Sequence, residues 1–357
     1  MSDARHVLVD RTDITTTRIE RTPTLEPAMG EILVRINRVA VTSNNITYAV
    51  VSDRIPYFEL FPAPPGWGRV PVWGFGDIVA SNAPGLEPGE RLYGFWPMST
   101  HILMQPDRIS SRFFIDGAEH RAQLPVVYNS YSRVATDETY EAHQEGRIAV
   151  FRPLFLTAFT LDGFMSEAGF FEAEQVVVSS ASSKTAWILA YLLARRSSIT
   201  TVALTSNRNH GFVNSLDLYD AVHEYDDLHQ IPAAPTVYVD FSGNSAIRAG
   251  LRRHLGKSLV HDYAVGLAHW DPDDNHQPAS GPAPTMFFAP AQFMRMVERQ
   301  GAAHLWLAYA DAWRGFLAST DRYTRIIEKN GIDALVDAYT SLAAGDVDPA
   351  RGVVVRF

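Results

Sequence analysis

The second half of the chain alternates short apolar strands with helices. The pattern predicts strands at 175–179, 200–205, 235–241, 257–265 and 285–289, and helices at 155–168, 184–196, 245–255, 292–299, 304–317 and 332–343. Strands joined by helical crossovers pair in parallel, because each crossover returns the chain to the same end of the sheet. A solvated loop at 271–284 and a closing strand at 353–357 are also expected. We therefore expect an α/β domain that binds ligands beyond the carboxyl ends of its strands.

The turn after the first of these strands is built from small hydroxyl residues and one lysine. The first N–H groups of the following helix lack backbone partners and carry the positive end of the helix dipole, so the turn favours an anion. The predicted phosphate-binding residues are Ala181, Ser182, Ser183, Lys184 and Thr185. The alternative is that Ser183 only caps a core helix.

The loop after the second strand reads TSNRNH over residues 205–210 and contains no carboxylate. A dinucleotide fold that prefers the unphosphorylated cofactor usually places Asp or Glu here, whereas a 2′-phosphate calls for hydroxyls and an arginine. The Arg208 guanidinium fits a phosphate in two-point fashion, and Ser206 and Asn207 can add hydrogen bonds. This pattern favours NADP(H), although such a stretch is also an ordinary polar turn before a helix.

The first 104 residues show short strands broken by turns that contain Pro and Gly. Strands are expected at 32–41 and 70–81, in a β-rich domain. Residues 105–150 have an irregular pattern, with a strand-like stretch at 124–127. We expect this connection to carry binding residues, as loops on rigid scaffolds often do.

Composition excludes several classes of function. A net charge of -9 argues against nucleic acid as the main partner, since such binders usually carry a basic face. The chain contains no cysteine, so it has no disulfide, thiolate zinc site or cysteine nucleophile. The 12 histidines form no recognisable metal-ligand motif with nearby carboxylates, and no metal is expected. No uninterrupted apolar run reaches ~18 residues and no secretory signal is visible, so the expectation is a cytoplasmic protein without a membrane span.

Motifs along the whole chain resemble the medium-chain dehydrogenase/reductase superfamily, in the style of its quinone and enoyl reductases. They are residues 34–49 around Asn44, GLEPGERLYG at 85–94, LTAF at 156–159, VYVDFSG at 237–243, and the closing segment 345–357. The resemblance implies a GroES-like β-rich domain plus a Rossmann doubly wound parallel-sheet domain. It places the first at 1–150, joined by the returning segment 335–357, and the NADP-binding Rossmann domain at 151–334. It also implies a homodimer that pairs through the edge strand at 285–289.

The resemblance extends the set of expected site residues. Cofactor contacts are expected from Thr157, Phe241, Ser242, Gly243, Phe287 and Phe288. Asn44, Tyr48 and Tyr128 are expected to donate hydrogen bonds to the substrate oxygen that gains charge, with a tyrosine as the proton source. For Tyr48 and Tyr128, the alternative is a role in packing alone.

Two features depart from the family pattern. Ala181, Ser183 and Ala186 replace the glycines of the dinucleotide fingerprint, and the side chains of Ser183 and Ala186 are expected to hinder close approach of a diphosphate. Lys184 is expected to compensate by direct charge contact. The residues of the family's zinc site are also missing, since there is no cysteine and Trp73-Gly74 stands near the place of the His-Glu pair.

Three functions remain open from the sequence. The favoured one is an NADPH-dependent, zinc-independent reductase of an activated carbonyl or conjugated C=C bond in a small, fairly apolar substrate. The second is a non-catalytic relative that binds NADP(H) as a structural or sensing ligand. The third, a phosphate-binding transferase, rests only on the Ser-Lys-Thr triplet at 183–185, and the first glycine of a P-loop is missing.

Overall fold

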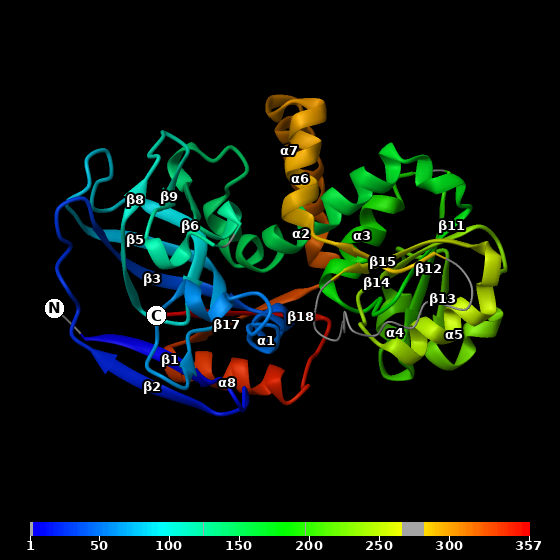
Figure 1. Ribbon diagram of the computed structural model, residues 1–357, viewed down its shortest axis with the longest axis horizontal. Helices are drawn as coiled ribbons and strands as arrows, with labels where there is room; N and C mark the ends of the chain where they lie inside the picture. The colour runs from blue at the N-terminus through cyan, green and yellow to red at the C-terminus, as the bar shows by residue number, and fades with distance from the viewer. Residues whose placement is uncertain (1–2, 124, 197, 266–281) are drawn as a thin grey trace. The chain divides into compact units, whose positions relative to one another are not determined.

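The computed structural model describes residues 3–123, 125–196, 198–265 and 282–357 (Figure 1). The chain divides into two compact units: Met1–Arg152 with Thr324–Phe357, and Pro153–Tyr323. The C-terminal segment grouped with the first unit starts at Thr324, whereas the sequence predicted 335. Most of the loop predicted at 271–284 lies outside the described residues.

The first unit is built from two β-sheets. The smaller sheet has the order β2-β1-β4, and the larger has the order β17-β18-β3-β5-β6-β10-β9-β8, with β7 also paired to β3. The strands are β1 Ala4–Asp10, β2 Thr17–Thr22, β3 Ile32–Val41, β4 Trp67–Gly68, β5 Pro71–Ser81, β6 Arg91–Pro97, β7 His101–Met104, β8 Pro106–Asp107, β9 Phe113–Asp116, β10 Ser130–Arg133, β17 Arg325–Asn330 and β18 Arg351–Arg356. The prediction of a β-rich domain is confirmed.

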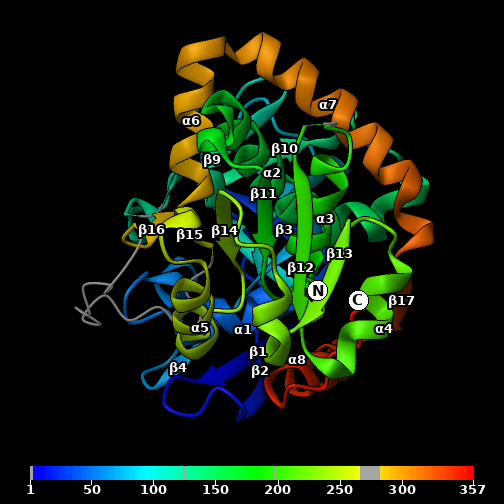
Figure 2. The ribbon, with the colours of Figure 1, turned by 90° about the vertical axis from the view of Figure 1, so that its right-hand side faces the viewer.

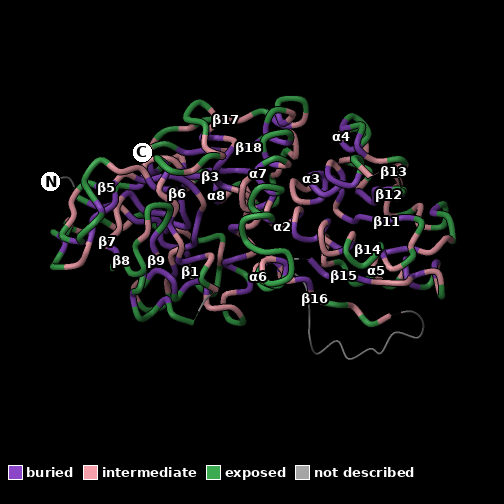
Figure 3. Tube along the Cα trace, turned by 90° about the horizontal axis from the view of Figure 1, so that it is seen from above, coloured by how far each residue is buried: buried purple, intermediate pink, exposed green. Residues whose placement is uncertain are grey.

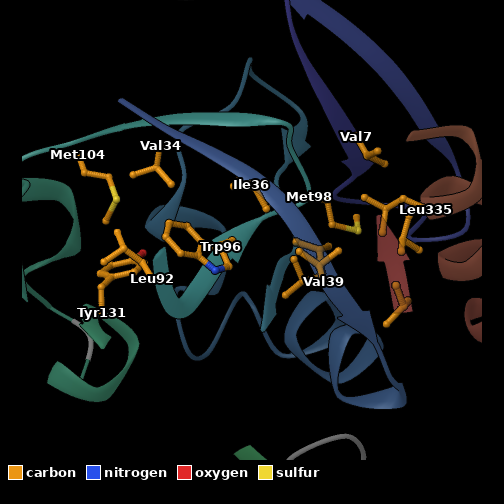
Figure 4. Close-up of a cluster of buried hydrophobic side chains, with 14 of the residues drawn as sticks. Val7, Val34, Ile36, Val39, Leu92, Trp96, Met98, Met104, Tyr131 and Leu335 are labelled. Atoms are coloured by element: carbon orange, nitrogen blue, oxygen red, sulfur yellow. The ribbon is translucent and has the colours of Figure 1, made fainter. Parts of the chain in front are cut away.

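Two helices, α1 (Ser43–Val50) and α8 (Ile332–Ala343), contribute to the core of this unit. In its sheet β18 runs antiparallel to β3, with Val354 opposite Ala40. Figure 4 shows part of the core, where β1, β3, β6 and α8 contribute Val7, Val34, Ile36, Val39, Leu92, Trp96 and Leu335. The end of the chain thus packs with its beginning in one apolar core.

The irregular connection differs from the sequence prediction at one point. Residues Val126–Tyr128 form a 3-10 helix rather than the expected strand, and Leu124 lies outside the described residues. Pro125 directly precedes this turn, and Tyr128 N–H donates to its carbonyl at 3.0 Å. Proline fixes its own φ and favours a turn start, which explains why an apolar stretch here does not extend.

The second unit contains a six-stranded parallel sheet with the order β13-β12-β11-β14-β15-β16 (Figure 2). Its strands are β11 Gln175–Val178, β12 Thr200–Thr205, β13 Ala221–Glu224, β14 Thr236–Asp240, β15 Leu259–Val265 and β16 Thr285–Phe287. Every pairing in this sheet is parallel. The predicted α/β class and the doubly wound order are confirmed.

Helices cover both faces of this sheet. Val202 and Leu204 pack on the face covered by α5 (Ser245–Leu255), whereas Ala203 packs on the opposite face with α4 (Asn207–Ser215). Because strand side chains alternate between faces, this division follows from the β12 sequence itself. Figure 3 shows that the central strands β11 and β14 are buried. The remaining helices are α3 Lys184–Leu193, α6 Ala289–Gln300 and α7 Ala302–Ser319.

One helix is longer than the sequence predicted. α2 spans Glu145–Glu167 and contains Pro153, whereas the pattern predicted a start at 155. It belongs to the helical stretch Ala142–Glu167, which is long and apolar enough to cross a membrane by length and composition. Since 61% of the apolar window is buried within the protein, a core helix explains it equally well and the evidence for a span is weak.

Candidate functional site

The carboxyl edge of the parallel sheet has the topology of a nucleotide site. From β11 the chain proceeds through α3 to β12 on one side, while β14 lies on the other side of β11. The order of the strands therefore reverses between β11 and β14. Ligands of open α/β sheets bind in the crevice at such a point.

A buried hydrogen-bond network joins the ends of these two central strands. The Ser179 hydroxyl donates to Asp240 Oδ1 at 2.6 Å and accepts from the N–H groups of Phe241 and Ser242 at 3.0 and 3.2 Å. Asp240 Oδ1 also accepts from the N–H groups of Ser242 and Gly243 at 2.8 and 3.2 Å. The N–H groups of the three predicted cofactor residues 241–243 are thus used within the protein. Their contacts to a ligand would come from side chains or carbonyl groups.

The turn between β11 and α3 is held by hydrogen bonds within its backbone and to a tyrosine side chain. Ser180 has a φ of 50°, an unusual value for a residue other than glycine. Its N–H donates to the Tyr225 hydroxyl at 3.0 Å, and its carbonyl accepts from the Ser183 N–H at 2.7 Å. Such strained backbone persists only where surrounding contacts hold it, and it concentrates at functional sites.

Ser183 stands directly before α3 with a hydroxyl that is not used. It occupies the N-cap position with φ -69° and ψ 146°, yet makes no side-chain capping hydrogen bond. Its Oγ is buried and has no hydrogen-bond partner in the described part of the chain. A buried hydroxyl without a partner is costly, so a ligand oxygen at this helix start would satisfy it. Ser183 therefore does not make the side-chain hydrogen bond that defines a helix cap, and this argues against a role in capping alone.

The two alanines of the altered fingerprint face the interior. Ala181 and Ala186 are both fully buried, and Ala181 packs with Ala203 and Val213. The Ala181 N–H donates to Leu204 O at 3.1 Å. The expectation that the Ala186 side chain hinders a diphosphate is therefore wrong, because its methyl group packs in the core.

Ser182 connects the turn to helix α4. Its side chain is buried, and its Oγ accepts from Asn209 Nδ2 at 3.0 Å. Lys184 and Thr185 lie half-buried in the first turn of α3. Of the predicted phosphate-binding residues, Ser183, Lys184 and Thr185 are therefore the three that the structure gathers at the helix start.

The predicted 2′-phosphate residues begin helix α4. Ser206 is its N-cap, and Asn207 and Arg208 are its first two residues, both exposed. Asn207 Nδ2 donates to Glu224 Oε1 and Oε2 at 2.9 and 3.0 Å. The loop sequence lacks a carboxylate, but the neighbouring strand β13 brings one to it.

Three further predicted cofactor residues have contacts within the second unit. Thr157 Oγ1 donates to Pro153 O at 3.3 Å, inside helix α2. Phe287 is buried, and its ring lies 6.0 Å from that of Phe164 and 6.1 Å from that of Tyr263. Phe287 thus packs in the core of this unit. Phe288, half-buried at the N-cap of α6, is the more exposed of the pair.

The first unit contains a cluster of aromatic rings around the predicted tyrosines. Tyr48 of α1 lies 4.7 Å from Tyr57 and 5.3 Å from Phe95, between ring centroids. The Tyr57 and Tyr128 hydroxyls are 3.1 Å apart and hydrogen-bonded. The Tyr128 ring lies 5.0 Å from Phe95 and 6.5 Å from Trp73. Tyr48 and Tyr128, which are far apart in sequence, therefore belong to one cluster.

Burial determines the protonation of these hydroxyls. Burial raises the pKa of Tyr48 above its usual value, and the neighbouring Tyr128 raises this pKa further. Hydrogen bonds with Trp73 and Asn44 lower it in part. Burial likewise raises the pKa of Tyr57 and of Tyr128. The charged form is disfavoured because it loses its hydration in the apolar cluster. The three hydroxyls are thus neutral at physiological pH and can donate hydrogen bonds.

A buried arginine holds the segment that carries Tyr128. Arg121 donates to Asp116 Oδ2, to the Tyr131 hydroxyl at 2.9 Å and to the Tyr128 carbonyl at 3.0 Å. Its guanidinium also lies 4.8 Å from the centre of the Phe61 ring. Only 1% of Arg121 is exposed, so its hydrogen bonds to Tyr131 and Tyr128 lie within the core of the unit.

Sequence analysis missed two residues with clear roles in these arrangements. Tyr57 was not among the predicted site residues, and the structure shows that it is the hydrogen-bond partner of Tyr128. Glu224 is the last residue of a half-exposed strand of four residues. This strand lacks the apolar run from which a strand can be predicted. In the described ranges no group of three or more His, Asp or Glu side chains could hold a metal ion.

Several solved structures share the fold over nearly the whole chain. CurA from Vibrio vulnificus, solved with NADPH, is 12% identical with a TM-score of 0.61, over 99% of this chain and 98% of CurA. The Etr1p/NADP/crotonyl-CoA complex is 13% identical with a TM-score of 0.58, over 100% of both chains. The yhdH oxidoreductase from Salmonella enterica, solved with NADP, is 13% identical with a TM-score of 0.55, over 99% of both. The predicted resemblance to quinone and enoyl reductases is thus confirmed for the fold.

Comparison of sequences places the chain in a family. A search of curated proteins found no match. Residues 39–348, most of the chain, match one family model. The chain belongs to the family described as "Protein of unknown function (DUF2855)".

Proposed function

We propose that the protein is an NADPH-dependent oxidoreductase that acts without zinc on an activated carbonyl or a conjugated C=C bond. The observation that carries this proposal is the Ser183 hydroxyl at the start of α3, where the strand order of the sheet reverses. This hydroxyl is buried and has no hydrogen-bond partner among the described residues. This is where a dinucleotide diphosphate binds in doubly wound folds. The likeness in fold to proteins solved with NADPH or NADP supports the same cofactor.

The residues of the second unit fit a phosphorylated dinucleotide. Ser183, Lys184 and Thr185 would hold the diphosphate through hydroxyl and ammonium donors at the positive end of the helix. Arg208 would bind the 2′-phosphate, because its exposed guanidinium has no ion-pair partner among the described residues. When bound, the nicotinamide supplies the hydride.

The tyrosine cluster of the first unit fits the substrate side of the reaction. Neutral hydroxyls of Tyr48 and Tyr128, together with the Asn44 amide, would donate hydrogen bonds to the substrate oxygen that gains charge. Their apolar surroundings strengthen such bonds and favour an apolar substrate. The crotonyl-CoA in the Etr1p structure is a conjugated thioester, which supports the C=C branch of the proposal.

The experiment measures binding and turnover separately. Calorimetry of the purified protein should show NADPH binding with a clear preference over NADH. A panel of enones, quinones and aldehydes should then oxidise NADPH, followed by the loss of its nicotinamide absorbance. Arg208→Ala should weaken NADPH about tenfold or more and leave NADH unchanged, because a charge-assisted bond to phosphate is lost. Equal and tight binding of both nucleotides by the unmodified protein would contradict the proposal.

A second candidate function is a non-catalytic relative that binds NADP(H) as a structural or sensing ligand. The altered fingerprint at Ala181, Ser183 and Ala186 favours it. Binding of NADPH without its oxidation by any member of the panel would select this alternative.

We also propose that the chain forms a homodimer through the outer edge of β16, which is the last strand of its sheet among the residues that the structure describes. An unpaired strand edge presents a row of N–H and C=O groups that a second copy can pair with. Size-exclusion chromatography with light scattering measures the mass, and a monomer at all concentrations would contradict this proposal.

A further inference from the structure

The carboxylate of Glu224 lies where the cofactor's 2′-substituent would be recognised. Glu224 ends β13 in parallel register with Thr205, which ends β12. Asn207 is the first residue of the helix that follows β12, and its amide nitrogen contacts both carboxylate oxygens at 2.9 and 3.0 Å. In dinucleotide folds, the end of the second strand is the position that distinguishes a 2′-hydroxyl from a 2′-phosphate.

This contact removes the donors that Asn207 would otherwise offer. An asparagine amide nitrogen has two hydrogens, and here it faces two carboxylate oxygens. A phosphate at this site would compete with Glu224 for them. The remaining polar atom of the Asn207 side chain is its amide oxygen. This oxygen only accepts hydrogen bonds, so it cannot bind a phosphate dianion.

The charge of Glu224 acts in the same direction. A phosphate monoester carries about −1.5 to −2 charges at neutral pH, so a carboxylate near it is repulsive. Arg208, the next residue after Asn207, is the opposing positive group. The site therefore combines one residue that favours a 2′-phosphate with one that disfavours it.

We propose that Glu224 limits the preference of this chain for the phosphorylated dinucleotide, by holding the Asn207 amide and by repelling the 2′-phosphate. This inference rests on the proposed function, since it concerns the same nucleotide site. The residue that would set cofactor selectivity is then the last residue of β13, whereas the sequence pointed only to the loop after β12.

The test compares Glu224→Gln with the unmodified protein by calorimetry with NADPH and with NADH. Glu224→Gln should tighten NADPH binding about five- to tenfold, because one like charge is removed at short range. The Kd for NADH should change less than about twofold. Glu224→Ala removes the same charge and frees the same amide, so it should shift the ratio in the same direction and replaces the Gln variant if that does not fold.

Asp226→Asn is the matched control. Asp226 is exposed and lies two residues after Glu224 in the chain. Its replacement by asparagine removes one negative charge but leaves the contact between Asn207 and Glu224 in place. An unchanged NADPH-to-NADH ratio in both Glu224 variants, or an equal shift in Asp226→Asn, would overturn the inference while leaving the proposed function intact. Failure of the unmodified protein to bind either nucleotide would overturn the proposed function and the inference together.

Discussion

The Ser179 hydroxyl donates a hydrogen bond of 2.6 Å to Asp240 Oδ1, and this bond joins the carboxyl ends of β11 and β14. Asp240 Oδ2 accepts in turn from Arg248 of α5 at 2.8 Å. Asp240 is 2% exposed, so its carboxylate oxygens face protein partners rather than solvent. The loop at 241–243 and helix α5 are therefore fixed by a single buried carboxylate.

Replacing this carboxylate should strongly destabilise the second unit. We expect Asp240→Ala to lower the free energy of unfolding by about 3–5 kcal/mol, because it leaves Arg248 without this partner in a buried setting. Urea denaturation followed by circular dichroism measures the change. The exposed Asp226→Asn variant should differ from the unmodified protein by less than about 0.5 kcal/mol. A small effect of Asp240→Ala would show that water replaces the network.

Ser183→Ala should separate binding from stability. The variant removes a buried hydroxyl that has no partner in the described chain, so the free protein should be equally stable or up to about 1 kcal/mol more stable. NADPH binding should weaken about tenfold, because a hydrogen bond to a charged group is lost. Ser182→Ala is the contrasting variant: it loses the bond from Asn209 and should cost about 1 kcal/mol in stability. Unchanged NADPH affinity in Ser183→Ala would argue against the diphosphate site.

Removing a tyrosine hydroxyl from the cluster should affect turnover rather than cofactor binding. We expect Tyr48→Phe and Tyr128→Phe each to lower kcat about 10²-fold, the typical loss when a donor to a developing oxyanion or a general acid is removed. The NADPH Kd should change less than twofold. Tyr339→Phe is the control. Tyr339 belongs to α8 and packs in the core of the first unit, and its hydroxyl is buried without a partner in the described ranges. Equal loss of kcat in all three variants would indicate a general structural effect.

Stability should fall in mild acid because of His6. Burial lowers the pKa of His6 from 6.5 to about 4, with a further contribution from Arg69. Its ring nitrogens contact Ser99 Oγ at 2.9 Å and Thr22 Oγ1 at 2.8 Å. The unfolded chain binds the proton more readily, so this contribution is complete above pH 6.5 and is lost as the pH falls towards 4.

Urea denaturation at several pH values tests the role of His6. We expect a loss on the order of 2 kcal/mol between pH 7 and pH 4.5 in the unmodified protein, in addition to other titrating groups. His6→Gln should lack this component of the pH dependence, since glutamine does not titrate. Identical pH profiles for the two proteins would show that His6 is not the responsible group.

The regular part of the second unit was predictable because its signals are local. Buried parallel strands such as β12 read as continuous apolar runs, and the structure confirms the predicted bounds of β12 and α5. Other elements gave no such signal. The strands β13 and β17 are half-exposed and carry charged residues, and α1 is a short helix within a β-rich region.

The sequence by itself determined the parallel sheet, the helix start at Ser183 and the absence of thiol chemistry, because each depends on neighbouring residues or on composition. Only the tertiary structure brought Glu224 to Asn207 and Tyr57 to Tyr128. These contacts depend on which strand pairs with which and on how a loop folds over a core. Such pairings are decided by the packing of the whole unit, and no local pattern encodes them.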